Sequence, residues 1–153
     1  MNDDCVFCRI LSGELESGKV AEDENAVAFM DIRAFNAGHV LVPRRHATQL
    51  GDLSEEEAAN VFRLVYRVAS VLPNSGVRCE GFHISKANGA AAGQEVFHAH
   101  FHIVPRFRGD PVHLSVDPDR PQFSREELNR YAVRIAAALT RTKKEQTGES
   151  LGS

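Results

Sequence analysis

The sequence predicts an α+β fold: five short strands in one antiparallel sheet, with one long helix and a C-terminal helix. Polar and apolar residues alternate in several short segments, which is typical of strands that bury one face. Short turns join these segments, and strands connected in this way run antiparallel. Two longer segments instead repeat their apolar residues at helical spacing.

The first three strands are expected before the long helix. Two of them fall within residues 19–32 and flank a polar turn at 22–25. The third is expected at residues 38–43, where His39 alternates with Val40 and Val42.

A capping box marks the start of the long helix. Ser54 is expected at the N-cap and Glu57 at the third helical position, where each side chain can bond the other's backbone N–H. The apolar stripe that follows consists of Ala58, Val61, Phe62, Val65, Val68, Ala69 and Leu72. Pro73 and Gly76 end the helix, and the stripe is expected to face the core.

The fourth strand is expected at residues 82–85 and the fifth at 96–104, closed by Pro105. Three histidines occupy alternate positions of the fifth strand. Successive strand residues point to opposite faces, so His98, His100 and His102 should share one face. Ala99, Phe101 and Ile103 should pack into the core.

The last third of the chain is expected to hold one irregular segment and one helix. Residues 108–122 contain three prolines, and a second capping box follows at Ser124 and Glu127. The apolar face of this second helix is Leu128, Tyr131, Ala132, Ile135, Ala136 and Leu139. We expect a single domain over residues 1–141 and a disordered polar tail over 142–153.

The composition indicates one globular domain with room for a hydrophobic core. The chain has 153 residues, of which 42% are hydrophobic and 25% charged, and its net charge of −3 argues against binding to nucleic acid polymers. Phosphate binding must then be local, and the arginines that could supply a patch are Arg44, Arg45, Arg106 and Arg108.

The sequence predicts a cytoplasmic protein without a membrane partner. Its apolar runs fall short of the roughly 18 residues that a membrane span needs, and its first residues lack the basic start of a signal peptide. Its three cysteines, an odd number, argue against a disulfide framework.

The three alternating histidines require a chemical explanation. Same-face neighbours on a strand lie roughly 6.5 Å apart, so the three imidazoles form a ladder about as long as a diphosphate. An imidazole serves as nucleophile, general acid or metal ligand near neutral pH. The preceding run of small residues at 87–94 allows a ligand to approach the backbone closely.

The segment 93–105, GQEVFHAHFHIVP, resembles the signature of the histidine triad (HIT) superfamily of nucleotide hydrolases and transferases. The resemblance extends from about Cys5 to Arg106. It implies a HIT-like sheet that pairs with a second copy in a homodimer, and a purine nucleotide or nucleotide conjugate as the partner. This sequence departs from the family pattern at Ala87 and Glu95.

The resemblance also implies a hydrolase that uses nucleotidyl transfer chemistry. His100 is then the nucleophile, with His39 and His102 as supporting partners at the phosphate. The reaction releases a nucleoside monophosphate such as AMP from a phosphoramidate, a dinucleoside polyphosphate or a related conjugate. The intermediate is a nucleotidyl-histidine, which water hydrolyses.

The substrate-binding residues are likewise implied by the resemblance. Asp31 matches the carboxylate that accepts from the ribose hydroxyls, and Gln94 matches an amide beside the phosphate. The positions that match the apolar slot for the base are Val6, Phe7, Ile10, Phe29 and Ile32. The family commonly has Asn or Gln at the position of Ala87, so Asn88 is a candidate replacement. It often has Ser or Thr at the position of Glu95, whose carboxylate would repel a polyanion.

The pair Cys5 and Cys8 has the spacing of a zinc half-site, although a redox pair and two free thiols are alternatives. A structural zinc commonly takes two cysteines and two histidines in a tetrahedron. The resemblance implies one structural zinc held by Cys5, Cys8, His46 and His98.

Two other functions stay open at this point. One is a purine-nucleotide-binding regulatory module whose catalysis is vestigial; the complete triad and Gln94 favour the hydrolase, since a pure binder could dispense with His100. The other is a zinc hydrolase whose three triad histidines bind the metal. That reading requires a general base such as Glu95 beside the metal and leaves Asp31 and Gln94 unexplained.

Overall fold

The computed structural model describes residues 4–113 and 119–147, with side chains described as far as residue 139. The chain divides into two compact units, Met1–His113 and Leu114–Ser153. The first contains the sheet and the second the C-terminal helix.

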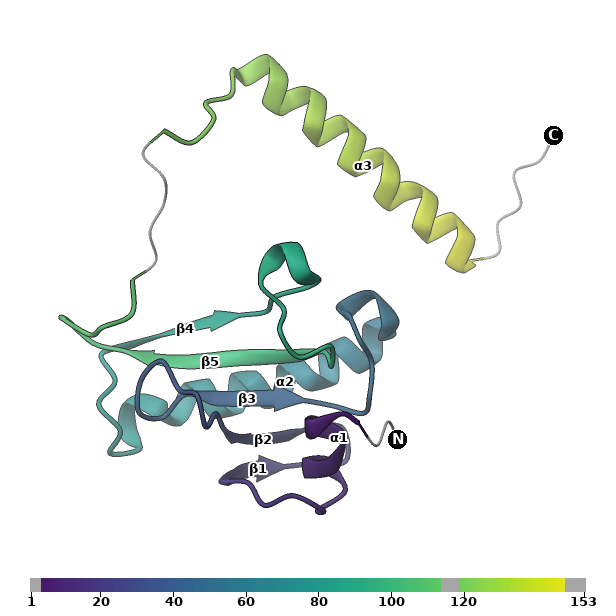
Figure 1. The fold of residues 1–153 in the computed structure, drawn as a ribbon. Helices are drawn as coiled ribbons and strands as arrows, with labels where there is room; N and C mark the ends of the chain where they lie inside the picture. Colours follow the sequence, from purple (N-terminus) through teal and green to yellow (C-terminus); the bar gives the residue numbers. More distant parts are fainter. Residues whose placement is uncertain (1–3, 114–118, 148–153) are drawn as a thin grey trace. The chain divides into compact units, whose positions relative to one another are not determined.

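The first unit is built on a five-stranded sheet in the order β1-β2-β3-β5-β4 (Figure 1). Every neighbouring pair is antiparallel, so the predicted α+β fold with an antiparallel sheet is confirmed. The strands are β1 (Lys19–Glu22), β2 (Val27–Met30), β3 (Val40–Pro43), β4 (Gly81–Ser85) and β5 (His100–Arg106).

One face of the sheet is covered by the long helix α2 (Glu55–Val71), which lies behind the strands in Figure 1. The predicted capping box is present, since Ser54 Oγ accepts from Glu57 N–H and the Glu57 carboxylate accepts from Ser54 N–H. The core between helix and sheet comprises Ala26, Ala28, Val40, Val42, Val61, Leu64, Val65, Val68, Ala69, Leu72 and Ile103. Short 3₁₀ turns occupy Leu50–Asp52, Leu72–Asn74 and Ala90–Ala92.

The opposite face carries the short helix α1 (Val6–Leu11) and two of the triad histidines. Phe7 of α1 packs with Val27, Phe29 and Leu41 in a second apolar cluster. Leu41 pairs with His102 across β3 and β5, and paired residues lie on the same side of a sheet. The α1 face is therefore also the histidine face.

The fifth strand differs from the predicted one at both ends. It begins at His100 rather than at residue 96, and it continues through Pro105 to Arg106. Before it, the His98 N–H bonds to Val96 O, so the chain bends at this point. His98 consequently leaves the ladder and turns toward the N-terminal cysteines.

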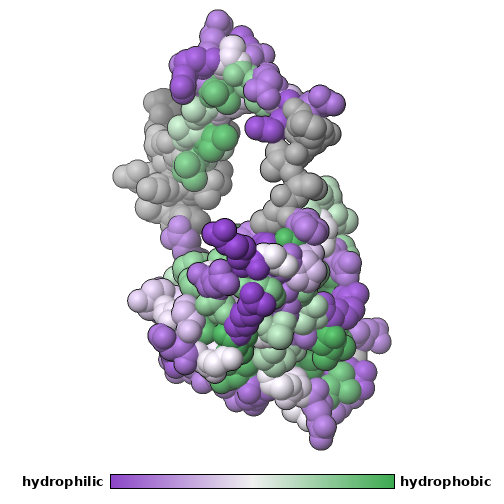
Figure 2. Space-filling view, turned by 90° about the vertical axis from the view of Figure 1, so that its left-hand side faces the viewer, coloured by the Kyte–Doolittle hydropathy of each residue, from purple (hydrophilic) through white to green (hydrophobic). Residues whose placement is uncertain are grey.

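The second unit contains the helix α3 (Arg125–Thr147), again started by a capping box. Glu127 N–H donates to Ser124 Oγ over 3.2 Å, and Ser124 N–H donates to Glu127 Oε2 over 2.8 Å. The helix extends past residue 141, where we expected the domain to end; residues 148–153 lie outside the described part, and the domain limits stay a prediction. Hydrophobic residues are exposed along it, and some are visible in green in the upper part of Figure 2. The large exposed hydrophobic side chains of this helix are Leu128, Tyr131, Val133, Ile135 and Leu139. No described helix has both the length and the apolar composition to cross a membrane.

Candidate active site and metal centre

A cavity of about 650 Å³ lies on the histidine face of the sheet. Its walls come from α1, the end of β2 with the loop after it, the end of β4 and the segment before β5. The lining residues that bear on function are Phe7, Ile10, Phe29, Asp31, Ile32, Arg33, Lys86, Gln94, Glu95, His100 and His102. The sheet thus brings most of the predicted catalytic and substrate-binding residues to one cavity.

His100 has one nitrogen bound to the backbone and the other available. Its Nδ1 lies 2.6 Å from His98 O, and a carbonyl can only accept, so Nδ1 carries the proton. The Nε2 atom then keeps its lone pair. Burial lowers the pKa of His100, which favours the neutral ring. A neutral imidazole with Nε2 unprotonated is the form that acts as a nucleophile.

His102 is oriented by His39. The Phe35 N–H donates to His39 Nδ1 over 3.3 Å, so the His39 proton is on Nε2 and is donated to His102 Nδ1 at 3.0 Å. The His102 proton is therefore on Nε2, in the cavity wall. Burial lowers the pKa of His102 to about 4 and also lowers that of His39.

Asp31 lies where the loop after β2 enters the cavity wall. Its Oδ1 accepts from Arg33 N–H over 2.8 Å. Its Oδ2 approaches His39 Nδ1 at 3.4 Å, but this nitrogen accepts from Phe35, so the approach is a contact and no hydrogen bond forms while the ring is neutral. The carboxylate therefore retains acceptor capacity for a ligand.

The predicted apolar slot is an edge-to-face cluster around Phe7. The Phe7 ring centroid lies 5.5 Å from that of Phe29 and 4.9 Å from that of His100. Ile10 continues the same wall. Ile32 lines the mouth and is 97% exposed, so a bound base would remove it from water.

Gln94 and Asn88 both bond to the protein around the cavity. Gln94 is buried; its Nε2 donates to Thr48 O and Val96 O, and its Oε1 accepts from Gly89 N–H. The amide thus holds the small-residue loop in place. Asn88 Oδ1 accepts from Leu50 N–H, and the cavity lining includes its neighbour Ala87 but not Asn88 itself.

The cationic side chains at the cavity are not the arginines that the sequence suggested. Arg44 and Arg45 pair with Glu57, and Arg106 pairs with Asp110. The cations that line the cavity are Arg33 and Lys86. Their positions directly after Asp31-Ile32 and directly after β4 were the signal that could have identified them.

The predicted metal ligands form one cluster at the N-terminal end of this site. The Sγ atoms of Cys5 and Cys8 lie 3.3 and 3.7 Å from His98 Nδ1, and His46 Nδ1 lies 3.3 Å from Cys8 Sγ. All four donor atoms lie within 4.8 Å of one another. A tetrahedral zinc with bonds of about 2.0–2.3 Å requires ligand separations of about 3.3–3.8 Å, so these residues fit the metal.

The orientation of His98 argues against a metal bound by all three triad histidines. Its Nδ1 faces the cysteines and its Nε2–H donates to Arg44 O over 2.7 Å. Neither nitrogen is turned to His100 or His102. Glu95, the residue suggested as general base for that alternative, instead pairs with Arg33.

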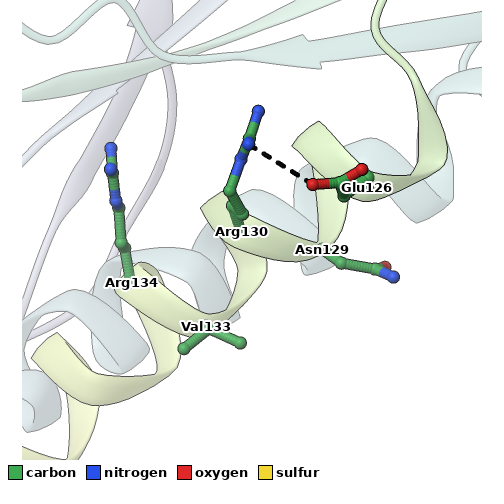
Figure 3. Close-up of a pocket in the computed structure, with 5 residues that line it drawn as sticks. All are labelled: Glu126, Asn129, Arg130, Val133 and Arg134. Carbon is green, nitrogen blue, oxygen red and sulfur yellow. Dashed lines mark ion pairs between the residues drawn. The ribbon is translucent and has the colours of Figure 1, made fainter.

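A second hollow lies along α3, and its lining residues differ in kind from those of the cavity on the sheet. Figure 3 shows its lining residues: Glu126, Asn129, Arg130, Val133 and Arg134. All five belong to one helix, and Arg130 pairs with Glu126 at 3.5 Å. These residues include no nucleophile or metal ligand pair, so the cavity on the sheet is the stronger candidate for the functional site.

Comparisons with known proteins found related sequences and solved structures. A family model described as the HIT domain matches residues 12–109. A crystal structure of a HIT family protein from Bacillus anthracis superposes with a TM-score of 0.81 at 33% identity, over 90% of this chain and 99% of that one. A zinc-bound histidine triad family protein from Mycobacterium smegmatis superposes with a TM-score of 0.69 at 38% identity, over 88% and 97%.

One relative found by sequence has a name that states an enzymatic activity. The adenosine 5'-monophosphoramidase of Schizosaccharomyces pombe is 37% identical over 136 residues, which are 88% of this chain and 98% of that protein.

Proposed function

Because this chain belongs to the HIT family, we propose that it is a hydrolase that releases a nucleoside monophosphate through a nucleotidyl-histidine intermediate. The favoured product is AMP, and the substrates are a phosphoramidate, a dinucleoside polyphosphate or a related conjugate. The similarity to an adenosine 5'-monophosphoramidase supports the choice of AMP.

The observation that carries this proposal is the hydrogen bond from His100 Nδ1–H to His98 O. It fixes the tautomer in which Nε2 has its lone pair on the cavity side. When Nε2 bonds to phosphorus, the ring gains positive charge, and the carbonyl at Nδ1–H stabilises that charge.

In the first step His100 Nε2 attacks the phosphorus that joins the nucleotide to its leaving group. The Nε2–P bond forms as the bond to the leaving group breaks, and the departing atom must gain a proton. His102 is the candidate donor: it takes up one proton from solvent before the step, donates the proton on Nε2 to the departing atom and is left neutral, while its contact with His39 at Nδ1 holds the ring in place.

In the second step water replaces the leaving group. His102, now deprotonated at Nε2, accepts a proton from the water as the oxygen attacks phosphorus. The P–N bond breaks, AMP is released and both histidines return to their starting tautomers. Dividing the displacement in two lowers the barrier of each part.

Nucleotide binding is assigned to the residues of the cavity wall. Asp31 accepts from the ribose hydroxyls, and the base lies against Phe7, Ile10, Phe29 and Ile32. Gln94 keeps the loop beside the phosphate in position. The nucleotide thereby places its phosphorus within reach of His100.

We further propose a structural zinc at Cys5, Cys8, His46 and His98. The donor spacing and the zinc-bound relative from Mycobacterium smegmatis support it. The ion supplies cross-links and no catalytic chemistry in this arrangement. It ties α1, and with it the base slot, to the segment that leads into the triad strand.

A homodimer is also part of the proposal. Strand β4 stands at one edge of the sheet, where its outer backbone groups can pair with a second copy. Size-exclusion chromatography with light scattering measures this state directly, and a monomeric mass at working concentration would remove it.

A panel of adenosine and guanosine phosphoramidates and dinucleoside polyphosphates tests the function. We expect AMP release from at least one adenosine conjugate, and a quench during turnover should trap label on the protein. Tight AMP binding without any release across the panel would instead favour the regulatory nucleotide-binding module.

A further inference from the structure

Glu95 lies where a carboxylate should weaken binding of a polyanion, and the structure places a cation against it. Its Oε2 accepts from Arg33 Nη2 over 2.8 Å, although the two residues are 62 positions apart. Both side chains line the cavity, and both are 71% exposed. Arg33 belongs to the loop after β2 and Glu95 to the segment before β5, so the ion pair joins two walls of the cavity at its mouth.

The contribution of this ion pair to the stability of the fold is too small to explain its presence. Exposed ion pairs contribute little because solvent screens the charges and both long side chains lose freedom. Removing either partner should therefore leave the fold intact. Its placement at the cavity is the feature that remains to be explained.

The leaving group of the proposed reaction must pass this mouth. In-line displacement puts the leaving atom on the side of phosphorus opposite to the attacking Nε2 of His100. His100 is buried, whereas both side chains of the ion pair are largely exposed, so we place the leaving group toward the exposed rim that carries Arg33 and Glu95.

The charges around the cavity suit one phosphoryl group. The lining has two cations, Arg33 and Lys86, and three carboxylates, Glu16, Asp31 and Glu95, which with neutral histidines gives a formal charge of −1. Lys86 Nζ bonds only uncharged groups among its described partners, Ala87 O and Asn88 Oδ1. Its charge is thus available to a phosphate, whereas that of Arg33 is already neutralised.

We propose that Arg33 and Glu95 form a charge filter at the cavity mouth, which disfavours leaving groups that carry further phosphates. A leaving group without charge passes the neutral pair unopposed. A polyphosphate places negative charge beside Glu95 and must separate it from Arg33 to gain a cation. This inference rests on the proposed hydrolase function and names Glu95 and Arg33 as specificity-determining residues for it.

The test compares diadenosine tetraphosphate with adenosine 5'-phosphoramidate as substrates. We expect Glu95→Gln to raise the ratio of their kcat/KM values by roughly three- to tenfold, the size of one partly screened unit-charge interaction. Arg33→Gln should lower the ratio by a similar factor, and both changes should shrink in high salt. Glu56→Gln, which alters an equally exposed ion pair on α2, is the matched control and should leave the ratio within about twofold.

Binding measurements separate failure of the filter from failure of the proposed function. If neither substrate is hydrolysed, the hydrolase proposal fails, and the filter is then tested by calorimetric affinities for ATP and AMP. Glu95→Gln should strengthen ATP relative to AMP by the same factor. Equal effects on both ligands or both substrates, or no effect, would overturn the filter.

Discussion

His39 Nε2 lies 3.0 Å from His102 Nδ1, so the histidine directly before β3 and a histidine within β5 share one hydrogen bond at the wall of the cavity. His39 is fully buried and His102 is partly exposed to the cavity. The buried ring can therefore fix the tautomer of the exposed ring without contacting the substrate itself. This division of roles, together with the backbone bond of His100, underlies the predictions for His100 and His102.

His100→Ala should abolish turnover while AMP affinity changes little. The variant loses only the nitrogen that forms the covalent bond, and binding rests on Asp31 and the apolar slot. Turnover is measured by AMP release and affinity by calorimetry. Wild-type protein should yield an acid-labile, base-stable labelled adduct that the variant lacks. A variant with wild-type rate would remove His100 as nucleophile.

Asp31→Ala should weaken AMP binding by about 1.5–3 kcal/mol, or roughly 10- to 150-fold, because the ribose loses a charged acceptor. Comparing AMP with 2',3'-dideoxy-AMP isolates the interaction with the ribose hydroxyls. In wild-type protein the dideoxy ligand should bind more weakly, and in the variant the two should bind alike. A variant that still prefers AMP would place the ribose elsewhere.

The stability of the protein should fall between pH 6.5 and pH 4 partly because of His102. Burial lowers its pKa from the usual 6.5 of a histidine to about 4 in the folded state. The unfolded chain therefore binds the proton first, so the neutral ring's contribution is complete above pH 6.5 and is lost as pH falls toward 4.

Denaturant titrations of His102→Asn and wild-type protein test this dependence. The variant has no titrating ring at this position, so its free energy of unfolding should fall less steeply with pH in that window. The difference between the two slopes should correspond to at most one bound proton. Parallel curves for the two proteins across the window would contradict the buried neutral state of His102.

Removing the zinc should lower the stability of the protein, and nucleotide affinity should fall as a consequence. Cys5→Ser takes one of four ligands, and structural sites couple metal binding to folding. Phe7 follows two residues later and forms the slot, so a loosened α1 should raise the AMP dissociation constant. Cys79→Ser is the control, because Cys79 Sγ bonds Gly81 O at the far side of the sheet. If metal analysis shows no zinc and Cys5→Ser is as stable as the control, the cysteines of the cluster are free thiols and not metal ligands.

The parts of this fold that sequence reasoning predicted are those set by local spacing. The capping box at Ser54 and Glu57 needs only a three-residue interval, and the common face of His100 and His102 follows from the period of a strand. The antiparallel pairing of β1 with β2 and of β2 with β3 follows in turn from their direct connections, whereas the place of β5 between β3 and β4 was not predicted.

The missed parts depend on residues that are far apart in the chain. His98 leaves the strand because its ring faces Cys5 and Cys8, some 90 positions earlier. The pairing of Glu95 with Arg33 depends on the same kind of distant approach. No periodicity records either contact, so the alternation of histidines extended the predicted strand too far toward its N-terminus.

Gly38 should be required at the position before His39. Its φ is +89°, and an added Cβ would lie 2.6 Å from Val77 Cγ1 and 3.1 Å from Pro105 Cγ. The left-handed backbone alone costs a side chain about 1–2 kcal/mol, and the clash with Val77 adds to that. Gly38→Ala should therefore lower the free energy of unfolding by more than about 1 kcal/mol.

The same change should reduce turnover, because a shift of Gly38 displaces His39 and with it the hydrogen bond to His102. Gly51→Ala is the matched control: nothing lies within 4 Å of its added Cβ, and its φ is ordinary. Adding Val77→Ala to Gly38→Ala removes the nearest obstacle and should restore part of both stability and turnover. If Gly38→Ala is as stable and active as Gly51→Ala, the backbone at Gly38 is free to adjust and His39 is positioned by its ring contacts alone.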